Sequence, residues 1–488
     1  MRGFLASSIG VTCAAALALP LAPPAAAATS AAEPTTGRTV RPEAYVPGST
    51  QSLPLAPLTH NRTPGAVEQG VPRRDVRHFS LVGVVWDNPD TELHGHVQVR
   101  TRATATGAWS GWQELETHNA DHAADPGTPE SASGRVRGAT APLWVGESDG
   151  VEVRVTASST SQASRATQTS RATQTSPDTE ASGAVRATAS PLPTGMRLEL
   201  VDPGEGAPPA AAPGPEEGPR TTAMTSTSAM TSMTDESPEA VAASAVNTDL
   251  APLGATEIPA LDRARTEAAL VALGGTGAQT AQQKAKPYVG PRPSITTRRG
   301  WGADEKLRER KFVYTKKVKT AFVHHSATGN NYTCKQAPSV IRSIYRYHVT
   351  SMGWRDVGYN FLIDKCGKIY EGRAGGVSKA VLGAHTLGFN SNSMGIAVLG
   401  TYTSKKPSSA AVKAVARLTA WKLGLHGMNP RGKTYLKSGG GNLYGKGKNV
   451  RLNVISGHRD GFATSCPGKK LYDKLGTIRS TAATYQGR

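Results

Sequence analysis

The sequence predicts an α/β domain with a mixed central β-sheet covered by helices, preceded by a β-sandwich-like N-terminal domain and a disordered linker. Short, evenly spaced segments of alternating apolar residues fill residues 75–204, which is typical of a β-sandwich. Residues 205–292 are rich in Ala, Pro, Ser and Thr, a composition typical of linkers. From residue 293 to 488 strand patterns alternate with helical patterns, which indicates one sheet covered by helices.

The first 28 residues predict a secretory signal peptide. A short positive start precedes an apolar run from Phe4 to Leu21, and four alanines follow, so cleavage is expected near Ala27 or Ala28. An uncleaved membrane anchor is the alternative, but prolines shorten the apolar run below the about 20 residues that a span requires. We therefore expect an exported protein with no transmembrane segment after signal cleavage.

Residues 29–74 are expected to be extended, because they are rich in Pro, Thr and Ala. In the β-rich domain that follows, residues 157–189 contain a literal repeat of six polar residues and predict a disordered insertion. A short helix is expected within the linker, at 261–273. The alternating patterns predict strands at 78–86, 94–104, 143–145, 151–155 and 196–201.

The C-terminal domain has a clear order of expected elements. Pro338 suits the first turn of a helix, and Asp364-Lys365-Cys366-Gly367 separates two apolar runs as in a hairpin. A helix is expected from Ser408 to Leu425, and a closing helix carries Leu471, Leu475 and Ile478. Buried strands are expected at 320–324, 359–363, 368–371, 395–399 and 453–457.

Charge is distributed unevenly between the two halves. Residues 281–488 contain 37 Lys and Arg against 8 Asp and Glu, a formal charge of +29, whereas the preceding residues carry −10. Such a basic domain predicts attraction to a polyanion. Nucleic acid is the generic candidate, but export favours anionic polymers of a cell wall.

Two distant segments carry candidate metal ligands. His324 and His458 each end an expected strand, and Cys466 follows His458 by eight residues, across a loop. Two imidazoles and one thiolate can hold Zn²⁺ while one tetrahedral position stays open for water, whose pKa the metal lowers to about 7. Buried histidines with a free core thiol are the alternative interpretation at this stage.

The cysteine count agrees with a metal site. Cys13 leaves with the signal peptide, so an odd number remains. If Cys466 binds metal, Cys334 and Cys366 form the natural disulfide pair of an exported protein. Either alternative pairing uses Cys466 and would destroy the metal site.

Seven ordered motifs over about 190 residues, from residue 295 to the end, resemble the peptidoglycan recognition protein family and the phage-type amidases that share its fold. The motifs are Arg299-Gly300-Trp301-Gly302-Ala303, Phe322-Val323-His324-His325-Ser326-Ala327, Gly353-Trp354-Arg355-Asp356-Val357-Gly358-Tyr359-Asn360-Phe361, Ile369-Tyr370-Glu371-Gly372-Arg373, Gly383-Ala384-His385, Asn392-Ser393-Met394-Gly395-Ile396-Ala397, and Gly457-His458-Arg459-Asp460 up to Cys466-Pro467. The resemblance implies a zinc-dependent N-acetylmuramoyl-L-alanine amidase that acts on peptidoglycan. The N-terminal domain resembles accessory domains of secreted bacterial amidases.

Carried over residue by residue, the family's zinc ligands fall on His324, His458 and Cys466, and its catalytic tyrosine falls on Tyr359. Thr464 stands where phage enzymes have lysine and many recognition proteins have threonine, which implies a hydrogen-bonding role. The resemblance also implies a substrate cleft at the positions that match the family: His385, Asn390 and Arg373. Arg373 is expected to pair either with a stem-peptide carboxylate or with Glu371.

Three functions compete. The main one is a secreted, wall-associated zinc hydrolase that cuts the bond between N-acetylmuramic acid and L-alanine. The second is a protein that binds peptidoglycan without cutting it, although such relatives typically lack the metal cysteine. The third is a thiol peptidase of Cys466 and His458, which requires a free thiolate within about 3.2 Å of its base.

Overall fold

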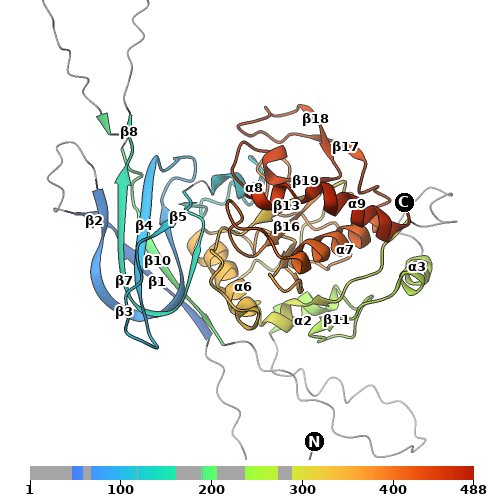
Figure 1. The fold of residues 1–488 in the computed structure, drawn as a ribbon, viewed down its shortest axis with the longest axis horizontal. Helices are drawn as coiled ribbons and strands as arrows, with labels where there is room; N and C mark the ends of the chain where they lie inside the picture. Colours follow the sequence, from blue (N-terminus) through green and yellow to red (C-terminus); the bar gives the residue numbers. More distant parts are fainter. Residues whose placement is uncertain are drawn as a thin grey trace, which may run out of the picture. The chain divides into compact units, whose positions relative to one another are not determined.

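A computed structural model describes residues 47–58, 68–117, 119–160, 188–189, 191–205, 237–272 and 288–488 of the chain (Figure 1). The expected signal peptide and the six-residue repeats lie outside the described residues. The described residues belong to one unit, Tyr45–Arg488. Within them, no helix is both long enough and apolar enough to cross a bilayer.

The N-terminal domain is an antiparallel sheet of eight strands, with β1, β10, β3, β7, β4 and β5 in order and β2 and β6 paired with β3. Strands β1 and β3 begin inside the segment expected to be only extended, 29–74, because they pair with β10 and β7. The strands expected at 143–145 and 151–155 are one strand, β7. The bounds are β1 (Pro47–Pro54), β2 (Ala56–Pro57), β3 (Glu68–Trp86), β4 (Gly95–Ala103), β5 (Gln113–Leu115), β6 (Gly138–Ala139), β7 (Leu143–Ala157) and β10 (Arg197–Gly204), with a separate pair β8 (Ser159–Thr160) and β9 (Thr188–Ala189).

The second half of strand β3, from Phe79 to Trp86, is buried on both faces, which explains why it is mostly apolar. Val82 and Val84 point into the core of the N-terminal sheet. Leu81 and Val85, on the opposite face, join a core that contains Ile344 of helix α6 (Ala337–Arg346) in the C-terminal domain. The two domains therefore share one hydrophobic core, which fixes the N-terminal domain against the C-terminal one.

The C-terminal domain has a mixed sheet of seven strands in the order β11, β12, β15, β14, β16, β13, β19, as the sequence predicts. Strands β13, β16 and β19 run parallel, and β14 and β15 form the expected antiparallel hairpin. The strand bounds are β11 (Glu257–Ile258), β12 (Ile295–Thr296), β13 (Thr320–His325), β14 (Phe361–Ile363), β15 (Ile369–Glu371), β16 (Ser393–Val398) and β19 (Ile455–Gly457), with a separate hairpin β17 (Lys433–Lys437) and β18 (Asn449–Asn453).

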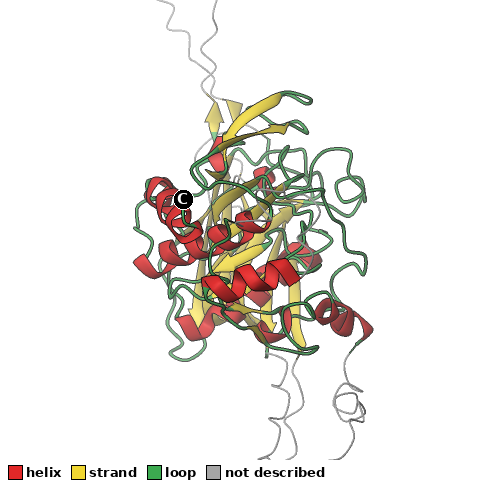
Figure 2. Ribbon diagram, turned by 90° about the vertical axis from the view of Figure 1, so that its right-hand side faces the viewer, coloured by secondary structure: helices red, strands yellow, loops and turns green. Residues whose placement is uncertain are grey.

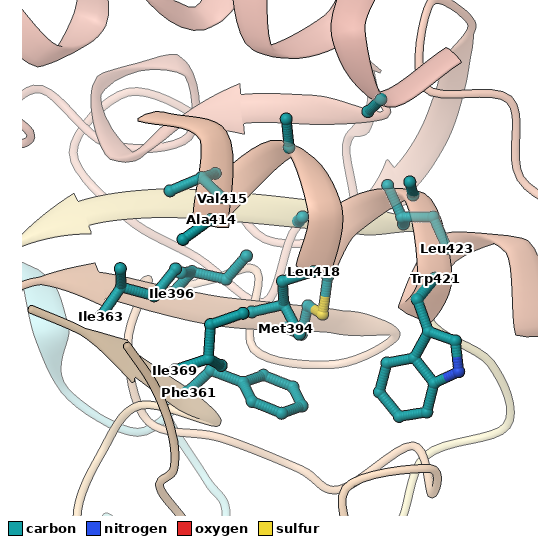
Figure 3. Packing of buried hydrophobic residues seen from close by; sticks show 14 of the residues in the cluster. Phe361, Ile363, Ile369, Met394, Ile396, Ala414, Val415, Leu418, Trp421 and Leu423 are labelled. Carbon is teal, nitrogen blue, oxygen red and sulfur yellow. The ribbon is translucent and has the colours of Figure 1, made fainter. Parts of the chain in front are cut away.

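Helices cover both faces of this sheet (Figures 1 and 2). Figure 3 shows one core, in which Ile363 and Ile396 meet Leu418 of α7. On the other face, Leu362 and Ala397 meet α6, as the period of two in a strand requires. The remaining helices are α2 (Pro238–Ala245), α3 (Arg263–Ala272), α5 (Arg298–Trp301), α7 (Ser409–Leu425), α8 (Lys469–Tyr472) and α9 (Leu475–Gln486), with short turns η1 (Ala120–His122), η2 (Cys334–Gln336), η3 (Tyr347–Ser351) and η4 (His458–Asp460).

The C-terminal half of the expected linker is folded. Helix α2 has Ser237 as its N-cap and Pro238 in its first turn, and β11 pairs with β12 of the central sheet. Between them, Asn247 donates its side-chain amide to both carboxylate oxygens of Glu371, at 2.9 and 3.1 Å. The α/β domain therefore includes residues well before 293.

Candidate metal centre

Parallel pairing of β13 with β19 brings two histidines to one edge of the sheet. Val323 lies opposite Gly457, and each is followed by a histidine, His324 and His458. The two imidazole centroids are 4.5 Å apart, and both side chains are fully buried. After η4 the chain returns and places Cys466 beside them, with its Sγ atom 3.8 Å from Nδ1 of His324. The three residues expected to bind metal thus lie together.

The spacing of these donors suits zinc. Each can offer an atom that lies within 4.8 Å of the others. Zn–S and Zn–N bonds of about 2.3 and 2.05 Å in a tetrahedron place sulfur and nitrogen about 3.6 Å apart, close to the distance found. Nδ1 of His458 is buried without a hydrogen-bond partner, as expected of a metal donor. The donor set therefore fits zinc.

Protonation also favours a metal. Burial, together with the neighbouring His458, holds the pKa of His324 well below its ordinary value, and burial lowers the pKa of His458 to about 3. Both rings are therefore neutral, as metal ligation requires. Burial and the Asp121 carboxylate raise the pKa of the Cys466 thiol, so without a metal it is not a thiolate.

These observations speak against a thiol peptidase. The imidazole nitrogens that contact Sγ of Cys466 are those of His122 and His324, both at 3.8 Å, beyond the reach expected for a nucleophile and its base. A thiol with a raised pKa is also a poor nucleophile at neutral pH.

A fourth donor, His122, comes from the N-terminal domain. It ends η1, and its Nε2 atom lies 3.8 Å from Sγ of Cys466, while its Nδ1 atom contacts Oδ1 of Asp121 at 2.8 Å. His122 is not among the donors expected from the sequence, because it lies in a stretch without strand or helix periodicity. That stretch, 116–142, was itself a signal, since long irregular loops in compact domains are usually functional.

Tyr359 lies beside the metal donors, with its ring centroid 5.5 Å from that of His324. Burial and then the nearby Cys466 raise its pKa well above the ordinary value, so its hydroxyl keeps the proton that it could donate. Thr464 is half-buried, and its hydroxyl accepts a hydrogen bond from the backbone N–H of Cys466 at 3.2 Å. No lysine takes part at this position.

His385 and Asn390 lie next to the same centre. The ring of His385 is 5.3 Å from that of His324, and it rests on Gly395 of β16, where a Cβ atom would lie 2.4 Å from Cγ of His385. Asn390 holds the chain here by accepting hydrogen bonds from the backbone N–H groups of His385 and Thr386 at 2.7 and 3.0 Å. Both side chains are fully covered.

Arg373 does not pair with Glu371, one of its two expected partners. Its guanidinium donates to both carboxylate oxygens of Glu130, each at 2.8 Å, whereas Glu371 is bound by Asn247 and by the backbone N–H of Arg298. Burial opposes ionisation of Glu130, but Arg373 outweighs it and lowers the pKa of the carboxyl group. The guanidinium of Arg373 is thus already paired with a carboxylate, and this carboxylate belongs to the N-terminal domain.

Cys334 and Cys366 are joined by a disulfide that links η2 to the turn between β14 and β15. Cys466 takes no part in it, and its thiol is free and buried. This is the expected pairing, and it leaves the Cys466 thiol available to a metal.

Comparison with known proteins gives matches in both domains. Residues 314–469 match the family described as N-acetylmuramoyl-L-alanine amidase, and residues 34–181 match the family described as Rv3811 N-terminal galactose-binding domain-like. The chain therefore consists of a galactose-binding-like domain followed by an α/β domain of the amidase type. This agrees with the predicted fold class.

Individual relatives match the C-terminal domain. Peptidoglycan-recognition protein SC2 of Drosophila simulans is 32% identical over 159 residues, which cover 32% of this chain and 72% of that protein. Human N-acetylmuramoyl-L-alanine amidase is 31% identical over 203 residues, 40% of this chain but only 30% of that protein. The solved structure of wild-type Drosophila PGRP-LB aligns with 38% of this chain and 92% of its own, at 24% identity and a TM-score of 0.30.

Proposed function

Because this chain belongs to the family of peptidoglycan recognition proteins and type 2 amidases, we propose that it is an exported zinc hydrolase. Its substrate is peptidoglycan, and the bond it cuts is the amide between N-acetylmuramic acid and L-alanine. The observation that carries this proposal is the convergence of His324, His458 and Cys466 beside Tyr359. A protein that only binds peptidoglycan has no need of these four groups together.

The residues have separate tasks. His324, His458 and Cys466 would hold zinc, which when bound supplies a Lewis acid and lowers the pKa of a water ligand to about 7. Tyr359 keeps its proton and would donate a hydrogen bond to the carbonyl oxygen as negative charge develops there. Thr464 can contribute a hydrogen bond but no charge.

The environment of the site supports the same chemistry. Thr386 approaches Nε2 of His324 at 3.5 Å, and a partner on the second nitrogen of a ligating histidine helps to fix the orientation of its ring. The complete burial of His324 and His458 keeps bulk water away, which strengthens electrostatic interactions in the site. Arg373 is a buried cation that binds a carboxylate bidentately, here that of Glu130, and a stem-peptide carboxylate that displaced Glu130 would find the same geometry.

The test is mass spectrometry of the fragments that the purified protein releases from defined muropeptides, with the metal content measured in the same sample. We expect one zinc per chain, release of free peptide from the lactyl group, loss of release with a chelator, and recovery with zinc. Cys466→Ser, which keeps the side-chain size, should lose both the metal and the cleavage. Binding of muropeptide by the zinc-loaded protein without any release would favour the binding-only function instead.

A further inference from the structure

Residues 119–137 of the N-terminal domain, which we term the cleft loop, lie directly on the candidate metal centre. The loop leaves the sheet after β5 and returns to it at β6. At its start, the carbonyl oxygen of Asp121 contacts Nε2 of His458 at 3.1 Å and accepts a hydrogen bond from the backbone N–H of Leu387 at 2.8 Å. His122 then offers the fourth donor to the metal group. The loop therefore reaches the centre through backbone and side chain together.

Further along, the cleft loop presents two carboxylates, the half-buried Asp125 and the buried Glu130, to the residues expected to hold substrate. Oδ1 of Asp125 accepts hydrogen bonds from the side-chain amide of Asn390 at 2.7 Å and the backbone N–H of Gly388 at 2.8 Å. The carboxylate of Glu130 accepts hydrogen bonds from both terminal nitrogens of Arg373, and it also accepts one from the backbone N–H of Arg355 at 3.2 Å. Every one of these partners belongs to the C-terminal domain.

The fit of the loop extends to its last residues. The backbone N–H of Arg137 donates to the carbonyl oxygen of Met352 at 3.1 Å. Next to it, Gly353 has a φ of 76°, and a Cβ atom there would lie 2.1 Å from the carbonyl oxygen of Arg135. Only glycine allows this close approach. The C-terminal domain thus contacts the cleft loop at its start, at Glu130 and at its end.

We propose that the cleft loop is an internal inhibitor, in which His122 is a fourth protein ligand of the metal and Asp125 and Glu130 occupy the residues that would hold the stem peptide. The inference rests on the proposed function, because it concerns the same site. Zinc with four protein ligands is typical of closed, structural sites, whereas catalytic sites keep one position for water or substrate. Carboxylates on Asn390 and Arg373 exclude an acidic peptide from the same positions by direct competition.

The chemistry of the loop explains why it can be displaced. Asp125, Glu130 and the backbone carbonyl of Asp121 present the kinds of group that a stem peptide carries, namely carboxylates and amide oxygens. A peptide of sufficient affinity, a partner of the N-terminal domain, or a cut within the loop would each free the metal position. The folded chain therefore hydrolyses its substrate more slowly than it would without the loop, and its rate scales with the fraction of molecules in which the loop is open.

The test compares the full chain with His122→Ala, after replacement of the bound metal by Co²⁺. The visible absorption of Co²⁺ depends on its ligands, so loss of one imidazole should change the spectrum and weaken metal affinity about tenfold or more. Hydrolysis of a defined muropeptide should rise by about tenfold or more, because the loop no longer closes the centre. His96→Ala is the matched control, since His96 is an exposed histidine of the same domain paired with Glu114. It should leave the spectrum, metal affinity and rate unchanged.

The outcomes separate this inference from the proposed function. An unchanged Co²⁺ spectrum and metal affinity in His122→Ala overturn the inference, and so does equal hydrolysis by the parent and the variant, which would still uphold the amidase. A changed spectrum with no hydrolysis by either protein supports the fourth ligand and contradicts the amidase. If His122→Ala does not fold, Glu130→Gln decides: tighter binding of a muropeptide with a free carboxylate supports the loop as inhibitor, and unchanged binding overturns it.

Discussion

Arg373 and Glu130 form a buried, bidentate ion pair between the two domains, across 243 positions of the sequence. Only 7% of the Arg373 side chain and 5% of the Glu130 side chain are exposed. Nε of Arg373 also donates to the carbonyl oxygen of Val357 at 2.9 Å, so the guanidinium is fixed from several sides. Removal of either charge would leave the other buried without compensation, which costs far more than loss of a surface pair.

Glu130→Gln is therefore expected to lower the free energy of unfolding of the full chain by about 3 kcal/mol, since breaking a buried pair leaves Arg373 uncompensated. The change keeps the shape of the side chain and removes only its charge. Chemical denaturation, followed by tryptophan fluorescence, measures the difference.

Glu114→Gln is the control for this prediction. Glu114 contacts His96 in the same domain, but both side chains are more than half exposed, at 52% and 69%. Its loss should change the free energy of unfolding by no more than about 1 kcal/mol. Equal effects of the two substitutions would contradict the assignment of Glu130 and Arg373 as a pair that holds the domains together.

The disulfide between Cys334 and Cys366 closes a loop of the C-terminal domain that contains α6 and Tyr359. Replacing both cysteines by alanine should lower the free energy of unfolding by about 3 kcal/mol, because the unfolded chain regains the freedom of that loop. The double replacement leaves no thiol to pair wrongly with Cys466. Peptide mapping without reduction should show the two cysteines joined in the parent protein, and alkylation of both in the native protein would refute the pairing.

Tyr359→Phe should keep the metal and the fold but lose most of the hydrolysis, by about 3 kcal/mol of transition-state stabilisation if the hydroxyl acts like one oxyanion-hole donor. The comparison is made in the His122→Ala background, so that the cleft loop does not limit the rate. Tyr370→Phe is the matched control, because the Tyr370 hydroxyl contacts Asp364, which is not part of the metal centre. Turnover of Tyr359→Phe close to that of its background, with zinc bound, would exclude Tyr359 from catalysis.

Much of the C-terminal domain could be predicted from the sequence, because local patterns determine it. The short, continuous apolar runs around Ile363 and Ile396 are typical of buried strands. Ser408 caps the start of one helix, and Pro338 lies in the first turn of another. The three expected metal donors could be proposed from the sequence because each lies in a short motif at the end of an apolar run or after a loop, and the structure brings them together. These signals lie within a few residues of the position that they specify.

The remainder depends on contacts between distant segments. His122 reaches the metal centre only because β3 packs on α6, and no local pattern encodes that packing. Helix α2 was assigned to the linker because its Ala-rich composition resembles a linker, although Ser237 and Pro238 form a recognisable start signal. The partner of Arg373 could not be predicted either, because the sequence around an arginine does not indicate which distant carboxylate it will meet in the fold.

The hairpin of β17 and β18 concentrates the positive charge of the C-terminal domain. Residues 431–451 contain no Asp or Glu. The segment carries six exposed basic side chains: Arg431, Lys433, Lys437, Lys446, Lys448 and Arg451. Such a cluster attracts a polyanion over about 10 Å at 0.1 M salt, and over shorter distances when the salt concentration is higher. The hairpin is therefore the expected contact with anionic wall polymers.

The full chain should sediment with insoluble cell wall at low salt and dissociate as the salt concentration rises, because the attraction is electrostatic and screened. Replacing Lys437, Lys446 and Lys448 by glutamine should move the dissociation to lower salt. The matched control replaces three other exposed lysines by glutamine and removes the same charge elsewhere: Lys405, Lys406 and Lys413. A larger shift in the hairpin variant places the contact on β17 and β18. Equal shifts would mean that net charge alone acts, and sedimentation independent of salt would exclude electrostatic attraction altogether.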